Sequence, residues 1–336
     1  MSEYPKASSE AISLQEQVPS VSNKPMQEAV AKLAGASRFE RTKASDGKEI
    51  IKSPETGEFR IYKLENEKDP MVDRLHRYML DEFGEEESET IEWLRISIRD
   101  RLNNYHIVED GQGNIAAFSN SQHLELPPQG GTDQTRESLL AMWHIATRED
   151  MRGKGMGREL YRKIYSDTLE DAKEKSRELK AIVGEAVASS EEFHNKIGWW
   201  RAYYNDQKGN VREVPYVCPP VDADSETGEP TEDPVPEHIM IQLLSGAESL
   251  ENEELLRMIN VMYREYVGQE HNYASRESYE KSLGYNMDIL DSLRKAISRS
   301  PDGKVFFLSG EEREQKKKEL RANKKRLYEV KTEEEE

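Results

Sequence analysis

The stretch Ser138–Thr147, with the sequence Ser-Leu-Leu-Ala-Met-Trp-His-Ile-Ala-Thr, decides the fold, because it is apolar at nearly every position. A strand that is covered on both faces has this pattern, so we expect it in the middle of a sheet. A glycine-rich turn follows, and then an amphipathic helix from Met156 to about Lys173. A second apolar strand, Leu179–Val187, comes next. This order predicts two adjacent parallel strands that are joined by a right-handed crossover.

The turn Arg148–Arg158 (Arg-Glu-Asp-Met-Arg-Gly-Lys-Gly-Met-Gly-Arg) is the strongest candidate for a binding site. Its glycines let backbone N–H groups approach a ligand, and the helix behind it offers unpaired N–H groups and the positive end of its dipole. We therefore predict a pyrophosphate site. A P-loop needs glycine where Arg148 stands, and a dinucleotide-binding fingerprint that starts at Gly153 needs a small residue where Arg158 stands, so both are excluded.

The pattern that does fit is Arg-x-x-Gly-x-Gly, from Arg152 to Gly157, between a buried strand and a helix. In this the chain resembles the GNAT superfamily of acyl-CoA-dependent N-acyltransferases. A second segment, Phe193–Trp199 (Phe-His-Asn-Lys-Ile-Gly-Trp), is similar to the family's Leu-Tyr-x-Lys-Leu-Gly-Phe segment. The resemblance covers the chain from Phe59 to Leu244. It implies an α/β (α+β) fold, with a mixed, mostly antiparallel sheet, a central parallel strand pair and flanking helices.

The resemblance also implies acetyl-CoA as the co-substrate. The loop would hold the pyrophosphate of coenzyme A, and the end of the preceding strand would pair with the pantetheine amides. The coenzyme A-binding residues implied in this way are Ile145, Ala146, Thr147, Arg152, Gly153, Lys154, Gly155, Met156, Gly157 and Arg158. We expect no metal.

Two side chains are the main candidates for catalysis. Glu185 interrupts an apolar strand, and burial of an unpaired carboxylate costs several kcal/mol, so it must be paired or face a cleft. We predict that Glu185 is a general base or binds the amine, with a salt bridge as the alternative. His194 stands where the family usually has a tyrosine that protonates the thiolate, and it either does so or only touches coenzyme A. Val187 stands where the family often has asparagine. His144 is a weaker base candidate, for which a satisfied core position is expected.

Other residues allow a structural and a functional interpretation. Glu85–Glu87 fall near the implied acceptor cleft, but a solvated charge run is the simpler interpretation. The aromatic residues within 199–204 fit a core, although a tyrosine hydroxyl there could replace the missing thiolate acid. Cys218, the single cysteine, excludes an internal disulfide. Since no base is evident beside it, we expect no covalent enzyme intermediate.

The composition limits the class of partner. Among 336 residues, 48 Lys+Arg oppose 66 Asp+Glu, which gives a formal charge of −18. This balance repels phosphate backbones and anionic membranes and attracts cations. We therefore expect a cationic amine as acceptor, no nucleic acid and no membrane partner. Apolar runs are far shorter than the about 20 residues of a membrane span, and the first residues lack a secretory-signal pattern, so a cytoplasmic location is expected. A homodimer is left open.

We divide the chain into four parts. These are a disordered tail over 1–48, an acyltransferase domain over 49–245 with an acidic, proline-rich loop at 219–236, a mainly helical extension over 246–309 and a charged tail over 310–336. The predicted function is transfer of an acetyl group from acetyl-CoA to a primary amine by direct attack in a ternary complex. The alternatives are a coenzyme A-binding module without turnover, acting in regulation or protein interaction, and a helical interaction protein built on Glu251–Glu336.

Overall fold

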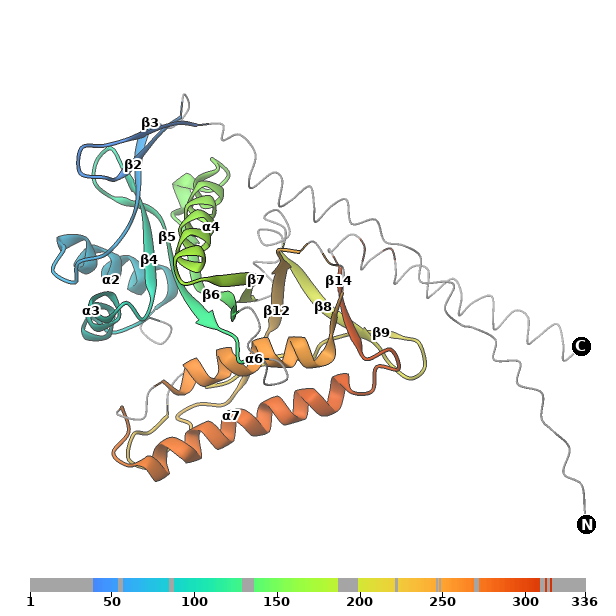
Figure 1. Cartoon of the computed structure of the whole chain (residues 1–336). Coiled ribbons are helices and arrows are strands. Elements are labelled where there is room, and N and C mark those ends of the chain that lie inside the picture. The colour runs from blue at the N-terminus through green and yellow to red at the C-terminus, as the bar shows by residue number, and fades with distance from the viewer. Residues whose placement is uncertain are drawn as a thin grey trace, which may run out of the picture.

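The computed structural model describes residues 39–53, 57–84, 88–128, 136–186, 199–220, 223–245, 247, 249–268, 272–308, 312 and 315. Within these residues, twelve strands form one mixed sheet (Figure 1). Its first half is antiparallel and consists, in spatial order, of β1 (Glu40–Lys43), β2 (Glu49–Ser53), β3 (Gly57–Lys63), β4 (Asn104–Asp110), β5 (Ile115–Glu125) and β6 (Arg136–Thr147).

The second half begins with β7 (Arg177–Ala186), which lies parallel to β6. The helix α4 (Met156–Glu174) connects the two strands. Beyond β7 the sheet is antiparallel again, with β12 (His238–Leu243), β8 (Trp200–Asn205), β14 (Lys304–Leu308) and β13 (Ser249–Glu251) in this order, and β9 (Val211–Glu213) beside β8. The predicted fold class, a mostly antiparallel sheet with a central parallel pair and flanking helices, is confirmed.

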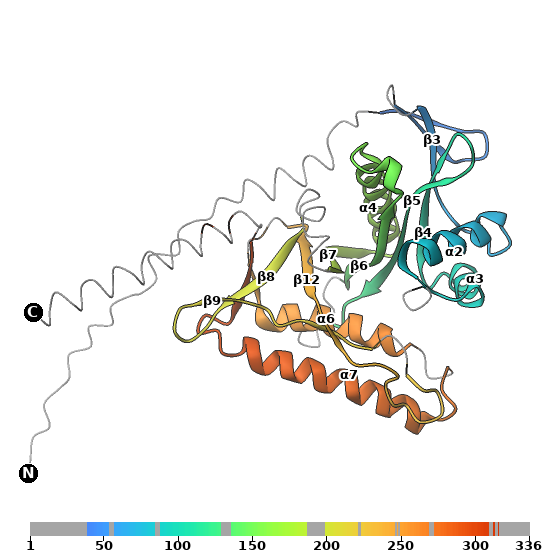
Figure 2. The same cartoon turned by 180° about the vertical axis from the view of Figure 1, so that it is seen from behind.

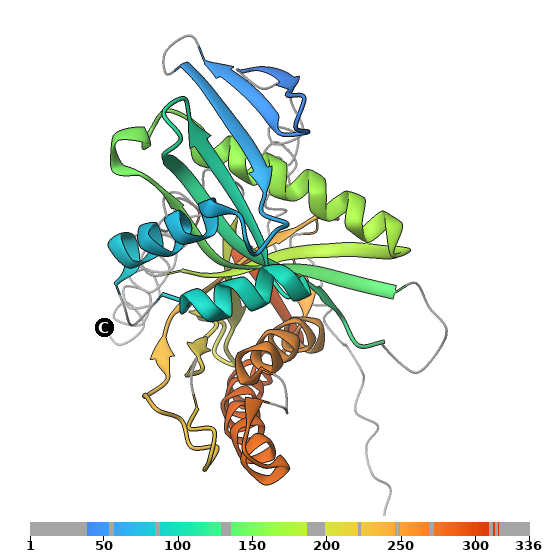
Figure 3. The same cartoon turned by 90° about the vertical axis from the view of Figure 1, so that its left-hand side faces the viewer.

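The helices cover both faces of this sheet (Figure 3). α4 lies on one face, while α2 (Pro70–Phe83), α3 (Ile91–Asp100), α6 (Asn252–Val267) and α7 (Arg276–Ile297) lie on the other. The apolar pattern of β6 explains this arrangement, because alternate side chains enter two cores. Leu140 packs in the core under α4, and Leu139 packs in the core under α6, and both are fully buried.

The second half of β6 contains a β-bulge and separates from β7. β6 and β7 pair from Arg136 and Arg177 to Met142 and Gly184, with one register shift after Ser138, and their pairing ends there. β6 continues to Thr147 and stays paired with β5. Its register with β5 shifts at Trp143, which is an extra residue opposite the bond between Asn120 and Ser121. The bulge turns the side chain of His144 toward α2, since one inserted residue exchanges the faces of a strand.

The N-terminal edge of the sheet corrects the predicted tail. Glu40–Lys43 form β1, antiparallel to β2, so the expectation of disorder up to residue 48 is wrong for this segment. Its four side chains are all exposed, which is why no apolar alternation marked it as a strand. Arg41 forms ion pairs with Glu49 of β2, at 2.6 Å, and with Glu159 of α4. The residues before 39 lie outside the described part of the chain.

The predicted C-terminal extension is part of the same fold. α6 and α7 lie within its bounds and pack side by side (Figures 1 and 2). β14 pairs with β8 and thereby extends the sheet. In the acidic loop, β10 (Val217–Cys218) pairs with β11 (Val235–Pro236). This loop contacts α7, since Ser278 Oγ donates a 2.6 Å hydrogen bond to the carbonyl of Glu226.

No helix within the described residues combines the length and the apolar character that crossing a membrane requires.

The close approach at Gly184 gives a first prediction. A Cβ atom on Gly184 would lie 2.5 Å from the Trp199 ring, so Gly184→Val should lower the free energy of unfolding by about 1–3 kcal/mol through overpacking. Gly284 of α7 is the control, since a Cβ there meets nothing within 4 Å. Gly284→Ala should raise the free energy of unfolding by roughly 0.5–1 kcal/mol. Urea unfolding followed by circular dichroism measures the free energy of unfolding of both variants. A Gly184→Val protein that is as stable as the wild type would contradict the close packing of Gly184 against Trp199.

Candidate active site

The opening between β6 and β7 is the centre of the candidate site. Arg148 N donates to Ala116 O at 2.9 Å, so alternation along the strand points the backbone groups of Ala146 and His144 toward β5 as well. The N–H and C=O groups of Ile145 and Thr147 then point into the opening. Arg152 Nε donates to Thr147 O at 3.0 Å, which agrees with this direction. Ile145 and Thr147, two of the three residues predicted to pair with pantetheine, therefore lie on a strand edge that is not paired with β7.

The glycine turn lies at the end of this edge. β6 leads through a 3₁₀ turn, η1 (Glu149–Met151), into α4. Gly153 and Gly155 have φ values of 75° and 89°, in the left-handed region that favours glycine. Gly155 is the N-cap of α4 and makes no side-chain cap bond. The first N–H groups of α4 have no intrahelical acceptor and, with the helix dipole, suit an anion.

The predicted coenzyme A residues of the turn divide into two groups. Arg152, Gly153, Lys154 and Arg158 are exposed, whereas Met156 and Gly157 are buried. The exposed cations lie beside the N-terminus of α4 and add to its positive potential. Arg152 also forms a 2.5 Å ion pair with Glu82 of α2, so its guanidinium connects the turn to the helix on the other face of the sheet.

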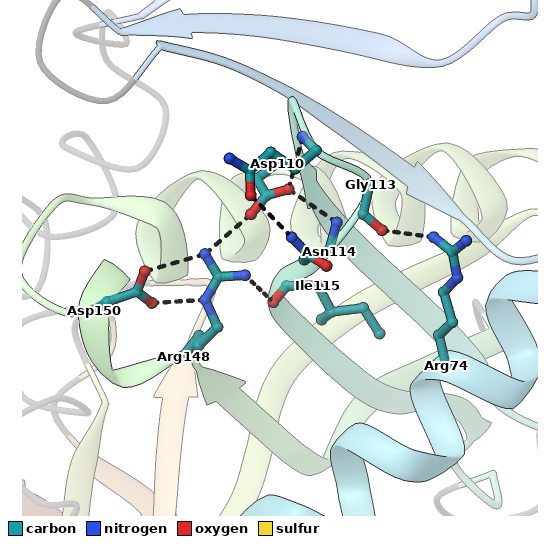
Figure 4. A network of polar contacts seen from close by, with 8 residues as sticks. Arg74, Asp110, Gly113, Asn114, Ile115, Arg148 and Asp150 are labelled. Atoms are coloured by element: carbon teal, nitrogen blue, oxygen red, sulfur yellow. Dashed lines mark hydrogen bonds and ion pairs between the residues drawn. The ribbon is translucent and has the colours of Figure 1, made fainter.

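Arg148 holds the turn in place (Figure 4). Its guanidinium binds Asp150 at 2.6 Å, Asp110 at 3.0 Å and the carbonyl of Ile115 at 3.0 Å. Hydrogen bonding by Arg148 lowers the pKa of Asp150, which keeps this carboxyl ionised. Arg74 of α2 binds the same hairpin through the Gly113 carbonyl at 2.7 Å. Arg148 is thus engaged within the protein, and the cations that face outward come later in the turn.

Glu185 lies on the α6 side of β7, next to the opening. The hydroxyls of Tyr216 and Tyr266 donate to its carboxylate, and Cys218 Sγ lies 3.5 Å from Oε2. Burial raises the pKa of Glu185, although these three hydrogen bonds act in the opposite direction. Among the described residues, the hydrogen-bond partners of Glu185 are two hydroxyls and a thiol. The alternative prediction, a salt bridge to Lys or Arg, is therefore not observed among these residues.

Cys218 has an acidic neighbour that the sequence did not reveal, because the contact depends on the placement of β10 beside β7. Burial raises the pKa of the Cys218 thiol, and Glu185 adds to this effect. The thiol is therefore held protonated, which disfavours its use as a nucleophile. Glu185, Cys218 and Glu237 bring one ligand atom each within 4.8 Å of one another, and a metal ion there would have to displace the tyrosine and thiol protons.

A second carboxyl lies on the β5 side of the opening. Glu89, which precedes α3, accepts hydrogen bonds of 2.5 Å from Tyr105 Oη and from Asn120 Nδ2. Burial raises the pKa of Glu89 from 4.5 to about 7, although both hydrogen bonds oppose this shift. Sequence reasoning missed Glu89, because it follows the charge run Glu85–Glu87 and nothing in composition separates it from solvated neighbours.

His144 lies directly opposite Asn120 in the strand register. The ring of Phe83 packs on it, with centroids 5.1 Å apart. Burial lowers the pKa of His144 to about 4, so the imidazole is neutral. The expected satisfied core histidine is not what the structure shows, since His144 Nδ1 is buried without a hydrogen-bond partner among the described residues.

The remaining predicted residues have different outcomes. His194, Val187, Glu85–Glu87 and most of the second family-like segment lie outside the described residues, so their roles stay predictions. The aromatic residues Trp199, Trp200, Tyr203 and Tyr204 are all buried. Trp199 Nε1 donates to Tyr161 Oη at 2.7 Å, on the α4 side of the opening. The core interpretation of this aromatic group is thereby supported.

The central parallel strand pair and the glycine turn that follows β6 belong to the arrangement that the resemblance to the GNAT superfamily implies. No protein-family description and no curated protein matches the chain. Among solved structures, an aminoglycoside acetyltransferase from an uncultured soil metagenomic sample, in complex with sisomicin, is 17% identical over 40% of this chain and 82% of its own, with a TM-score of 0.30.

Two further solved structures are similar over longer parts of the chain. Arabidopsis thaliana NAA60 in complex with acetyl-CoA is 8% identical over 56% of this chain and 99% of its own, with a TM-score of 0.37. A Desulfovibrio desulfuricans protein, proposed to be an acetyltransferase of the GNAT family, is 11% identical over the same shares, with a TM-score of 0.34. At these low scores the description of the fold rests on the strand order of the chain itself.

The raised pKa of Glu89 predicts a pH-dependent stability. The carboxyl is protonated in both states below about pH 4.5, and ionising it in the folded state above pH 7 costs up to about 3 kcal/mol. Stability from this group is thus present at low pH and lost as the pH rises through 7. Relative to Glu89→Gln, which does not titrate, the wild type should lose free energy of unfolding between pH 4.5 and 8.

The control for this prediction is Glu92→Gln, on the exposed side of α3. Its unfolding profile should follow the wild type across the whole pH range. Denaturant unfolding at a series of pH values gives all three profiles, and identical profiles for Glu89→Gln and the wild type would show that the carboxyl does not titrate near neutral pH.

Proposed function

We propose that the protein is an acetyl-CoA-dependent N-acetyltransferase that acts on a primary amine. The observation that carries this proposal is the opening after Met142 and Gly184, because it combines an unpaired strand edge with the N-terminus of α4. A strand edge offers alternating donors and acceptors to amides, and a glycine-capped helix N-terminus offers N–H groups to a diphosphate. Coenzyme A carries both, with two amides along its pantetheine arm and a diphosphate at one end of that arm.

In this proposal the ten predicted residues bind coenzyme A in two parts. The edge of Ile145 and Thr147 pairs with the pantetheine amides, and Ala146 places its side chain in the core near α2. The amides after Gly153 and Gly155 hold the diphosphate, with Lys154 and Arg158 beside it. The acetyl thioester then lies near the β6 bulge, because the arm runs back along the strand from the turn.

The reaction is a direct transfer. The amine nitrogen attacks the thioester carbonyl carbon with its lone pair, the C–S bond breaks, the amine proton passes to a base and the thiolate takes up a proton. Glu185 is our candidate for the base, because burial raises its pKa toward the working pH. His194 stays the candidate that protonates the thiolate. The protonated state of Cys218 argues against an acyl-enzyme intermediate.

A coenzyme A-binding module without turnover is the second candidate. It is favoured by the departures from the family at His194 and Val187 and by the two tyrosines that already bind Glu185. The two candidates differ in one measurement, the release of free thiol from acetyl-CoA over a panel of amines. Coenzyme A binding without release would favour the module.

A valine in place of a glycine of the turn should weaken the binding of coenzyme A. Gly155 has a φ of 89°, and a Cβ there would lie 3.5 Å from the Phe39 ring, so Gly155→Val strains the backbone that presents the helix amides. Coenzyme A affinity, measured by calorimetry, should fall by roughly tenfold or more for about 1–3 kcal/mol of strain. Gly209→Val, which has a similar φ in a distant turn, is the control and should bind coenzyme A like the wild type.

Glu185→Gln tests the proposed base. The amide keeps the shape of the carboxyl but takes no proton, so kcat should fall by about 10²–10⁴ while coenzyme A affinity stays unchanged. Glu178→Gln, on the exposed end of the same strand, is the matched control. Thiol release under saturating acetyl-CoA measures the effect, and full activity of Glu185→Gln would remove Glu185 from the mechanism.

A further inference from the structure

We propose that the acceptor is a polycationic amine, and that Glu89, Asn120 and His144 bind one of its ammonium groups while another lies at Glu185. This rests on the proposed function, which it narrows from a primary amine to a linear diamine or polyamine. The two carboxyls lie on either side of the β6 bulge, and no sequence argument had brought Glu89 into the site.

The first part of the proposed acceptor site is a set of three hydrogen-bond acceptors. Glu89 holds Asn120 by its Nδ2 at 2.5 Å, which leaves Asn120 Oδ1 to face away from that bond. Asn120 is only 1% exposed, and its Oδ1 has no partner among the described residues. His144 Nδ1 is buried and likewise without a partner there. An ammonium group has three N–H donors, and a carboxylate, an amide oxygen and a neutral imidazole nitrogen match them in number and kind.

Strand register and side-chain contacts connect this group of acceptors to Glu185. His144 is opposite Asn120, and the bulged Trp143 is its neighbour in β6. The Trp143 ring packs on Tyr266 of α6 with centroids 5.2 Å apart, and Tyr266 donates its hydroxyl proton to Glu185. The bulge therefore places His144 opposite Asn120, which binds Glu89, and Trp143 against Tyr266, which binds Glu185.

The rim of this region is also negative. Glu265, next to Tyr266 in the last turn of α6, is exposed and accepts a 2.7 Å hydrogen bond from Gln122 of β5. Gln122 in turn accepts from Trp143 Nε1 at 3.3 Å. The C-terminal end of α6 adds the negative end of its dipole. A cation that approaches this region from solvent therefore meets the exposed Glu265 carboxylate.

Glu89 and Glu185 differ from other carboxyls that face the sheet in the charge of their neighbours. Asp167 and Asp171 of α4 lie against His106 and His123, and each also pairs with a lysine, at 2.5 Å and 2.8 Å. In the part of the chain that the structure describes, Glu89 and Glu185 interact only with tyrosine, asparagine and cysteine side chains. A buried carboxylate without a counter-charge is costly, and a cationic acceptor supplies the missing charge.

The test compares amines of different charge on the full-length protein. Thiol release from acetyl-CoA is measured with butylamine and 1,4-diaminobutane, which share a four-carbon chain, and with spermidine, which extends the diamine by an aminopropyl group. The expected result is a kcat/KM for the two polyamines that exceeds the value for butylamine by about tenfold or more, as a charged hydrogen-bonded contact contributes. Equal kcat/KM values for butylamine and the diamine would overturn the inference and leave the proposed function standing.

Glu89→Gln adds a test within the site. It should raise KM for 1,4-diaminobutane by about tenfold, change KM for butylamine much less and leave coenzyme A affinity unchanged. Glu170→Gln, an exposed change of the same charge on α4, should have no such effect. A parallel loss for both amines would indicate a structural role for Glu89 and overturn the assignment. If no amine releases thiol although coenzyme A binds, the proposed function fails and this inference fails with it.

Discussion

The loss of hydrogen bonding between two parallel strands is the constraint on which the rest depends. β6 and β7 pair only as far as Met142 and Gly184, although both strands continue. The backbone groups of Ile145 and Thr147 are therefore not paired with β7, and this edge is where we propose that the pantetheine amides bind. Trp199 contacts Gly184 on the α4 side of the opening, and α6 covers the other side through Tyr266, which leaves the edge and the turn as the path for that ligand.

The bulge at Trp143 connects this backbone feature to the acceptor chemistry. One inserted residue turns His144 toward α2 and leaves Trp143 toward α6, so a single strand contributes to two acidic regions. The C-terminal helices are therefore part of the proposed site and not an appendage, because Tyr266 binds Glu185 and Glu265 binds Gln122. The predicted extension over 246–309 is thus in contact with residues of the predicted acyltransferase domain over 49–245.

Local pattern predicted the centre of the fold, and long-range contacts account for what it missed. The continuous apolar run of β6, the glycine turn and the amphipathic α4 each reside in one stretch of sequence. Glu185 was predicted as a candidate because it is a single acid in an apolar strand. Glu89 was not, since its burial depends on Tyr105 and Asn120 from two other strands. The pairing of β14 with β8 and the contact of Cys218 with Glu185 likewise bring together residues that no local pattern connects.

The ion pair between Arg41 and Glu159 affects the charge at the N-terminus of α4, where we propose that the diphosphate of coenzyme A binds. Glu159 is a buried carboxyl in the first turn of α4, where its charge suits the helix dipole but would repel a diphosphate at the same terminus. Arg41 from β1 and Arg162, at 3.2 Å, neutralise it. The outermost strand thus supplies a charge that compensates Glu159 at the proposed nucleotide end of the site, and a chain that lacks β1 would lose this compensation.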